Sequence, residues 1–87
     1  MNIDHNKIWN SIDKIAYING ISVSALAKKA GLDSTAFNKS KRMYPCGKCR
    51  WPSTESVCKV LKVMNLDWGK FCQYMEEADP TSKKSND

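Results

Sequence analysis

Apolar residues recur at intervals of three and four along most of this chain, which places them on one face of a helix. The first stripe consists of Ile8, Ile12 and Ile15. It predicts a helix from about Asp4, a candidate N-cap, to about Tyr17. The strict alternation of apolar and polar residues that a half-buried strand requires is missing. The pattern therefore predicts an all-α fold.

Two short helices separated by a glycine are expected next. Ser22 is a candidate N-cap for the second helix, and Gly31 is expected to end it, because a left-handed backbone costs glycine least. Asp33 or Ser34 is expected to cap a third helix. Ala27, four residues before Gly31, is small enough to let the two helices cross closely. This spacing predicts a helix-turn-helix formed by helices 2 and 3.

An irregular connection from Met43 to Pro52 is expected to precede two more helices, with Ser53 and Asp67 as candidate N-caps. Their apolar stripes are Val57, Val60, Leu61 and Met64, and then Trp68, Phe71, Cys72 and Met75. We therefore expect one compact five-helix domain over residues 1–77. Residues 78–87 are polar and lack apolar periodicity, which predicts a disordered tail or the start of a linker.

Positive charge is concentrated in one part of the chain. The net charge of the 87 residues is +5, yet residues 28–50 alone carry +6 and the rest carries −1. The basic residues of that segment are Lys28, Lys29, Lys39, Lys41, Arg42, Lys48 and Arg50, against Asp33. A local positive field of this kind favours a polyanionic partner.

The sequence gives no sign of a membrane or secreted protein. No run approaches the roughly 18 apolar residues that a membrane span needs. The N-terminus also lacks the layout of a signal peptide. We therefore expect a cytoplasmic protein whose four cysteines are mostly reduced.

The predicted helix order is similar to that of the lambda-repressor-like family, also called the Cro/CI or XRE family. The runs GLDSTAFNKSKR and RWPSTES further resemble the DNA-binding head of phage-type, LexA-like repressors. The resemblance covers about residues 4–76. It implies a sequence-specific transcriptional regulator, of the phage or prophage repressor type, that binds a palindromic operator in double-stranded DNA through the major groove.

The resemblance also assigns roles to residues of this chain. The third helix would present its base-reading side chains, which are Ser34, Thr35, Asn38 and Lys39, to the major groove. The chemistry agrees, because an Asn amide can bond the adenine edge and a Lys can donate to guanine acceptors. Phosphate contacts fall to Ser22, Ser24, Lys41, Arg42, Lys48 and Arg50. In the family the last helix often contributes to a homodimer, which here would involve Trp68, Phe71, Tyr74 and Met75.

Cys46 and Cys49 have the spacing of half a structural zinc site. A closed tetrahedral site needs two more ligands, and no other pair has ligand spacing. We therefore expect a surface turn with two free thiols, and neither a metal nor another cofactor. Cys58 and Cys72 are expected to pack in the core.

His5 has no nucleophile or carboxylate at catalytic spacing and is expected to be an exposed residue at the helix start. Trp51 is expected to pack beneath the connecting loop. The chain shows no paired carboxylates, nucleophile–base pair or glycine-rich phosphate loop, so no enzyme is expected. Two function classes remain: the DNA-binding regulator, and a protein-interaction module on the same fold, such as an antitoxin-like or adaptor protein.

Overall fold

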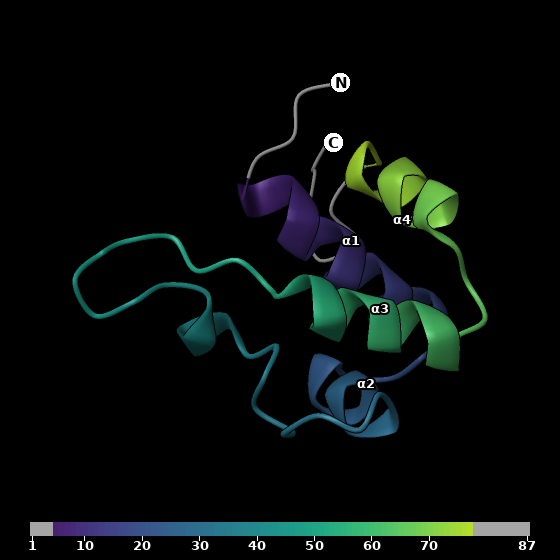
Figure 1. The fold of residues 1–87 in the computed structure, drawn as a ribbon, viewed down its shortest axis with the longest axis horizontal. Coiled ribbons are helices and arrows are strands. Elements are labelled where there is room, and N and C mark those ends of the chain that lie inside the picture. Colours follow the sequence, from purple (N-terminus) through teal and green to yellow (C-terminus); the bar gives the residue numbers. More distant parts are fainter. Residues whose placement is uncertain (1–4, 78–87) are drawn as a thin grey trace.

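The protein is described by a computed structural model, which places residues 5–77 in an all-helical, compact arrangement (Figure 1). The elements are α1 (His5–Ile18), α2 (Val23–Lys29), the short 3-10 helix η1 (Lys39–Lys41), α3 (Thr54–Val63) and α4 (Trp68–Met75). The all-α prediction is confirmed, but with four α-helices among the described residues instead of five. The N-cap predicted at Asp4 and the polar tail from residue 78 lie outside the described residues.

Three of the predicted N-caps are confirmed, because each side-chain oxygen accepts a hydrogen bond from a first-turn amide. Ser22 accepts from Ala25 at 3.1 Å, Ser53 accepts from Ser56 at 3.0 Å, and Asp67 accepts from Lys70 at 2.8 Å. Each cap satisfies an amide that the helix itself leaves without a partner. Local sequence signals therefore set the starts of α2, α3 and α4.

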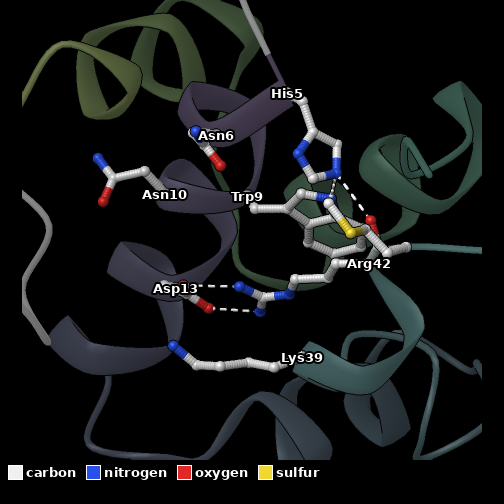
Figure 2. A pocket seen from close by; sticks show the side chains of 8 residues that line it. His5, Asn6, Trp9, Asn10, Asp13, Lys39 and Arg42 are labelled. Atoms are coloured by element: carbon white, nitrogen blue, oxygen red, sulfur yellow. Dashed lines mark hydrogen bonds and ion pairs between the residues drawn. The ribbon is translucent and has the colours of Figure 1, made fainter. Parts of the chain in front are cut away.

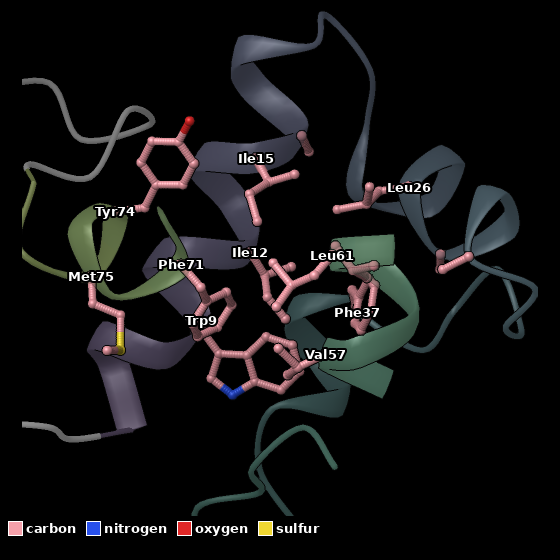
Figure 3. Packing of buried hydrophobic residues seen from close by; sticks show 14 residues of the cluster. Trp9, Ile12, Ile15, Leu26, Phe37, Val57, Leu61, Phe71, Tyr74 and Met75 are labelled. Atoms are coloured by element: carbon pink, nitrogen blue, oxygen red, sulfur yellow. The ribbon is translucent and has the colours of Figure 1, made fainter. Parts of the chain in front are cut away.

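The core lies between the four α-helices, where α1 packs against α4 and α2, and α2 packs against α3 (Figure 3). Its largest fully buried apolar side chains are Phe37, Phe71, Ile12, Ile15, Leu26 and Val60. Phe37 comes from the segment between α2 and η1, so this irregular segment is tied to the core by its ring. No helix within residues 5–77 is both long and apolar enough to span a membrane.

The predicted third helix does not form as an α-helix. Residues 34–37 form turns, and only Lys39–Lys41 is helical, as η1. The backbone bonds join residues three apart: Ala36 N–H to Asp33 O, Asn38 N–H to Thr35 O, and Lys41 N–H to Asn38 O. An α-helix needs bonds between residues four apart. The second half of the predicted helix-turn-helix is therefore a turn followed by one 3-10 turn.

Side-chain bonds explain this outcome. The Asp33 carboxylate accepts the Thr35 amide at 2.9 Å and the Thr35 hydroxyl at 2.8 Å, which stabilises a turn in place of a helix. Further on, the Arg42 guanidinium donates to the Phe37 carbonyl, which in an α-helix would accept from Lys41. Both ends of the segment thus have partners that compete with helical bonding.

The connection after η1 is a short antiparallel hairpin, which we call the basic hairpin (residues 42–50). Met43 and Cys49 form an isolated β-bridge, and the Arg50 amide donates to the Arg42 carbonyl at 3.0 Å. At the tip, the Gly47 amide donates to the Tyr44 carbonyl at 2.8 Å, and Gly47 has a φ of +93°. Figure 1 shows this segment as the loop that extends away from the helices.

Candidate nucleic-acid interface

One face of α1 holds the segment that carries the positive charge. His5, Trp9 and Asp13 are spaced four apart, so they lie along the same side of this helix. All three contact residues of the basic hairpin, as Figure 2 shows for Arg42. The basic hairpin is therefore attached to the most extensively packed helix of the fold.

Arg42 and Asp13 form a buried ion pair with two parallel hydrogen bonds. Nη1 and Nη2 lie 3.0 Å and 2.7 Å from the two carboxylate oxygens, and the two side chains are only 12% and 7% exposed. The guanidinium also donates to the Phe37 carbonyl and lies 4.5 Å above the centre of a Trp9 ring. Arg42, which was predicted to bind a phosphate, therefore has its charge balanced by Asp13 inside the fold.

His5 and Trp9 hold the base of the basic hairpin from the same side. His5 Nε2 lies 2.9 Å from the carbonyl oxygens of both Arg42 and Arg50. Trp9 Nε1 donates to the Arg50 carbonyl at 2.9 Å. Trp9 Nε1 also lies 3.0 Å from His5 Nε2. Because the indole has the Arg50 carbonyl as an acceptor, a proton on His5 Nε2 lets the imidazole donate to the carbonyls of Arg42 and Arg50. The two strands of the hairpin are thereby joined at their base.

Two predictions about aromatic residues are corrected by these contacts. His5 is half-buried and bonded, whereas an exposed position was expected. Trp51 is 49% exposed and meets the His5 ring edge-on at 6.0 Å between centroids, instead of packing beneath the loop. Trp9 and Phe37, by contrast, are buried, and their ring centroids lie 6.1 Å apart.

The lysines predicted to face DNA are exposed. Lys39 and Lys41 lie on η1 and Lys48 lies on the basic hairpin, and Lys28 and Lys29 on α2 are exposed as well. Arg50 is half-buried and donates from Nη1 to the Lys41 carbonyl at 2.9 Å, which holds η1 against the hairpin. The exposed positive charge therefore comes mainly from lysines, and the two arginines fix the backbone that carries them.

The structure brings the start of α2 close to η1. Ser22 and Lys39 line the same shallow, mostly apolar cavity, together with Tyr17 and Val23. Lys39 also lines a second open cavity of about 350 Å³ beside the Asp13–Arg42 pair, and Figure 2 shows its side chain extending toward α1. Ser24, the other predicted phosphate ligand of α2, is half-buried in the first turn.

The four residues predicted to read bases no longer share a helix face. The Thr35 hydroxyl donates to Asp33, and Ser34 is half-buried in the same turn. Asn38 is also half-buried, and its side chain makes no capping bond to η1. Hydrogen bonds from the Thr35 backbone and hydroxyl, with the nearby charge of Lys41, hold the pKa of Asp33 below its usual value. Asp33 therefore stays ionised at neutral pH and keeps the turn bonded.

Cys46 and Cys49 are exposed free thiols on the basic hairpin. Cys58 is also exposed on α3 and Cys72 is half-buried, so the core position predicted for Cys58 is wrong. Cys58 follows the buried Val57 directly along α3 and thus points to a different side of the helix. Within residues 5–77, no three His, Cys, Asp or Glu side chains are grouped so that they could hold a metal ion.

The apolar stripe of α4 closes the core of the monomer. Phe71, Tyr74 and Met75 are buried, mainly because α4 packs against α1. These three residues, which were predicted to contribute to a dimer, are therefore covered by the chain itself. Trp68, at 46% exposed, is the one member of the predicted dimer set that stays accessible.

The contacts made by Asp13 and His5 were missed by sequence reasoning. Charged residues such as Asp13 are normally exposed, so the sequence alone predicts no buried role for it. A signal was nevertheless present, since Asp13 follows the buried Ile12 and lies four residues after Trp9, on the side of α1 that faces the core. An acidic residue at such a position requires a buried cationic partner.

Comparison of the chain with protein-family models, with curated proteins and with solved structures finds no match. The proposed function therefore rests on the chain's own residues, on their arrangement and on the resemblance that its sequence motifs carry.

Proposed function

We propose that this protein binds double-stranded DNA and regulates transcription by doing so. The observation that carries the proposal is the set of exposed lysines on α2, η1 and the basic hairpin, which are Lys28, Lys29, Lys39, Lys41 and Lys48. Across this segment Asp33 is the single acidic residue. A surface that combines several lysines with so little negative charge is suited to the regular phosphates of a nucleic acid.

The way the lysines are held supports the proposal further. Arg42, Trp9 and His5 fix the base of the basic hairpin through bonds of 2.7 to 3.0 Å. A surface that is held in place before binding loses less conformational entropy when it meets its partner. Arg42 thus contributes to binding indirectly, because its contacts inside the fold hold the backbone that carries the lysines on either side of it.

The resemblance to lambda-repressor-like proteins supports the same partner and adds the regulatory role. It suggests a phage- or prophage-type repressor that binds a palindromic operator as a dimer. Residues 34–38 form no α-helix, so the base-reading helix that the resemblance implies is missing at this position. We therefore assign phosphate contacts to Lys39 and Lys41 and seek the reading element elsewhere on the surface.

Selection of bound duplexes from a pool with a random central segment tests the proposal. At low salt we expect retention of duplexes that share a motif, and an inverted repeat in that motif would indicate two bound copies. Retention of no duplex would contradict DNA binding and would favour the protein-interaction module. In that case the exposed Tyr17, Ile18 and Trp68 are the surface to test against a protein partner.

A further inference from the structure

We propose that the basic hairpin enters the major groove of duplex DNA as a two-stranded ribbon and reads it with Tyr44 and Lys48. This inference rests on the proposed function, and it names the element that reads the sequence. Residues 34–37, where the base-reading helix was predicted, form turns, and the Phe37 ring is buried in the core. The basic hairpin is the exposed segment that extends away from the helices (Figure 1).

The register of the hairpin decides which side chains share a face. The Tyr44 amide donates to the Lys48 carbonyl at 2.9 Å, and the Arg50 amide donates to the Arg42 carbonyl at 3.0 Å. Met43 and Cys49, which lie between these bonds, are therefore a directly opposed pair on one face. Successive residues of a strand alternate between faces, so Tyr44 and Lys48 lie on the other face.

The tip has the construction of a stable three-residue loop. Pro45 follows Tyr44, whose carbonyl accepts the Gly47 amide, and Gly47 has the positive φ that such loops require at their last residue. The φ of proline is fixed, and glycine adopts the left-handed conformation at little cost. The loop is therefore formed before any partner binds, which lowers the entropy lost on binding.

The dimensions of the hairpin fit the major groove and exceed those of the minor groove. Paired strands lie about 4.8 Å apart before side chains are added, whereas the minor groove is only about 6 Å wide and the major groove about 12 Å. From its base at residue 42 to the loop at residue 45, the arm extends about 10 Å at about 3.3 Å per residue. The major groove is about 8.5 Å deep, so the tip reaches the base edges.

The chemistry of this face suits base edges flanked by phosphates. Lys48 is exposed and carries three donors for the guanine acceptors, and the half-exposed Tyr44 adds a hydroxyl that donates or accepts. Lys41 and Arg50 line a hollow beside Tyr44 at the base of the arm. This position places the Lys41 charge where the sugar–phosphate backbone borders the groove.

The experiment compares three proteins on the random duplex pool: the native chain, the double variant Tyr44→Ala/Lys48→Gln, and Lys62→Gln as the matched control. Lys62 is exposed on α3 and lines a hollow with Ala30, Lys59 and Val63, none of which belongs to the hairpin. We expect the double variant to bind the duplexes selected by the native chain roughly tenfold or more weakly and to select a different or weaker motif. The control should leave both affinity and motif unchanged.

A second measurement uses the native chain alone, so it does not depend on the folding of a variant. Replacing guanine by 7-deazaguanine in a selected duplex removes the N7 acceptor of the major groove, and we expect weaker binding, whereas a minor-groove ligand should not compete. Unchanged motif and affinity in the double variant would overturn the role of the hairpin and leave DNA binding intact. Failure of the native chain to bind any duplex would overturn both proposals.

Discussion

Among residues 5–77, Asp13 is the charged residue that is buried, and its carboxylate balances the charge of Arg42. The pair also fixes the local backbone, since Arg42 donates to the Phe37 carbonyl from the same guanidinium. Removing one partner of a buried ion pair leaves the other charge without compensation in a poorly solvated site. The stability of the fold and the placement of the hairpin therefore depend on the same residue.

We predict that Asp13→Ala lowers the free energy of unfolding by about 3 kcal/mol, because it leaves the Arg42 charge buried without a partner. Urea denaturation followed by circular dichroism measures this change. The matched control is Glu55→Ala, which removes the acidic partner of Lys59 in an exposed pair on α3. The control is expected to cost less than about 1 kcal/mol. Equal costs for the two variants would contradict the structural role of Asp13.

The roles of single residues were predictable from the sequence only where the contact is local. Ser22, Ser53 and Asp67 were predicted as caps because each bonds an amide three residues away. Arg42 was not, because its partner Asp13 is 29 residues distant and nothing in the sequence distinguishes Arg42 from the neighbouring lysines. The ion pair of Arg42 can be recognised only in the folded structure, where the hairpin packs against α1.

The helices, like the single residues, were predictable where local sequence signals determine them and not where a distant contact does. The apolar stripes and caps predicted α1, α2, α3 and α4 at close to their observed positions. The third predicted helix failed because its sequence is rich in residues that bond the backbone in turns, including Ser34, Thr35 and Asn38. The distant Arg42–Asp13 pair adds to this effect by drawing the Phe37 carbonyl away from helical bonding.

The basic hairpin could not be predicted from its own sequence, although its turn residues were visible as an irregular connection. Strand periodicity over residues 42–50 is too short to recognise, and the pairing is a single bridge. Much of the support for the hairpin comes from α1, through His5 and Trp9. The predicted site and the proposed one thus share this segment of the chain, but the α-helix predicted for residues 34–42 is a turn followed by η1.

We predict that His5→Ala loosens the basic hairpin without unfolding the helices, because it removes the imidazole that bonds the Arg42 and Arg50 carbonyls. Hydrogen exchange at the Arg50 amide should become about tenfold faster, which corresponds to the loss of one hydrogen bond of about 1.4 kcal/mol. The matched control is Asn6→Ala, an exposed neighbour that lines the same cavity. If His5→Ala leaves exchange at Arg50 as slow as the control does, the hairpin is held by other contacts.

At the scale of the whole molecule, the fold combines helices of mixed charge with one strongly basic segment. All four α-helices contribute to one apolar core, and the exposed charges of α1, α3 and α4 are of both signs. The exposed lysines of α2, η1 and the basic hairpin carry the positive excess on the remaining part of the surface. This asymmetry gives the protein one preferred orientation toward a polyanion.

The salt dependence of duplex binding tests this account most directly, and fluorescence anisotropy measures it for a labelled duplex from the selected pool. Each lysine–phosphate contact contributes about −0.9 to the slope of log affinity against log salt concentration. We predict that replacing Lys39, Lys41 and Lys48 by glutamine reduces the magnitude of that slope by about 2.7. Replacing Lys59, Lys62 and Lys70, which are exposed on α3 and α4, should leave the slope unchanged. Equal slopes for the two triple variants would contradict the assignment of DNA binding to this surface.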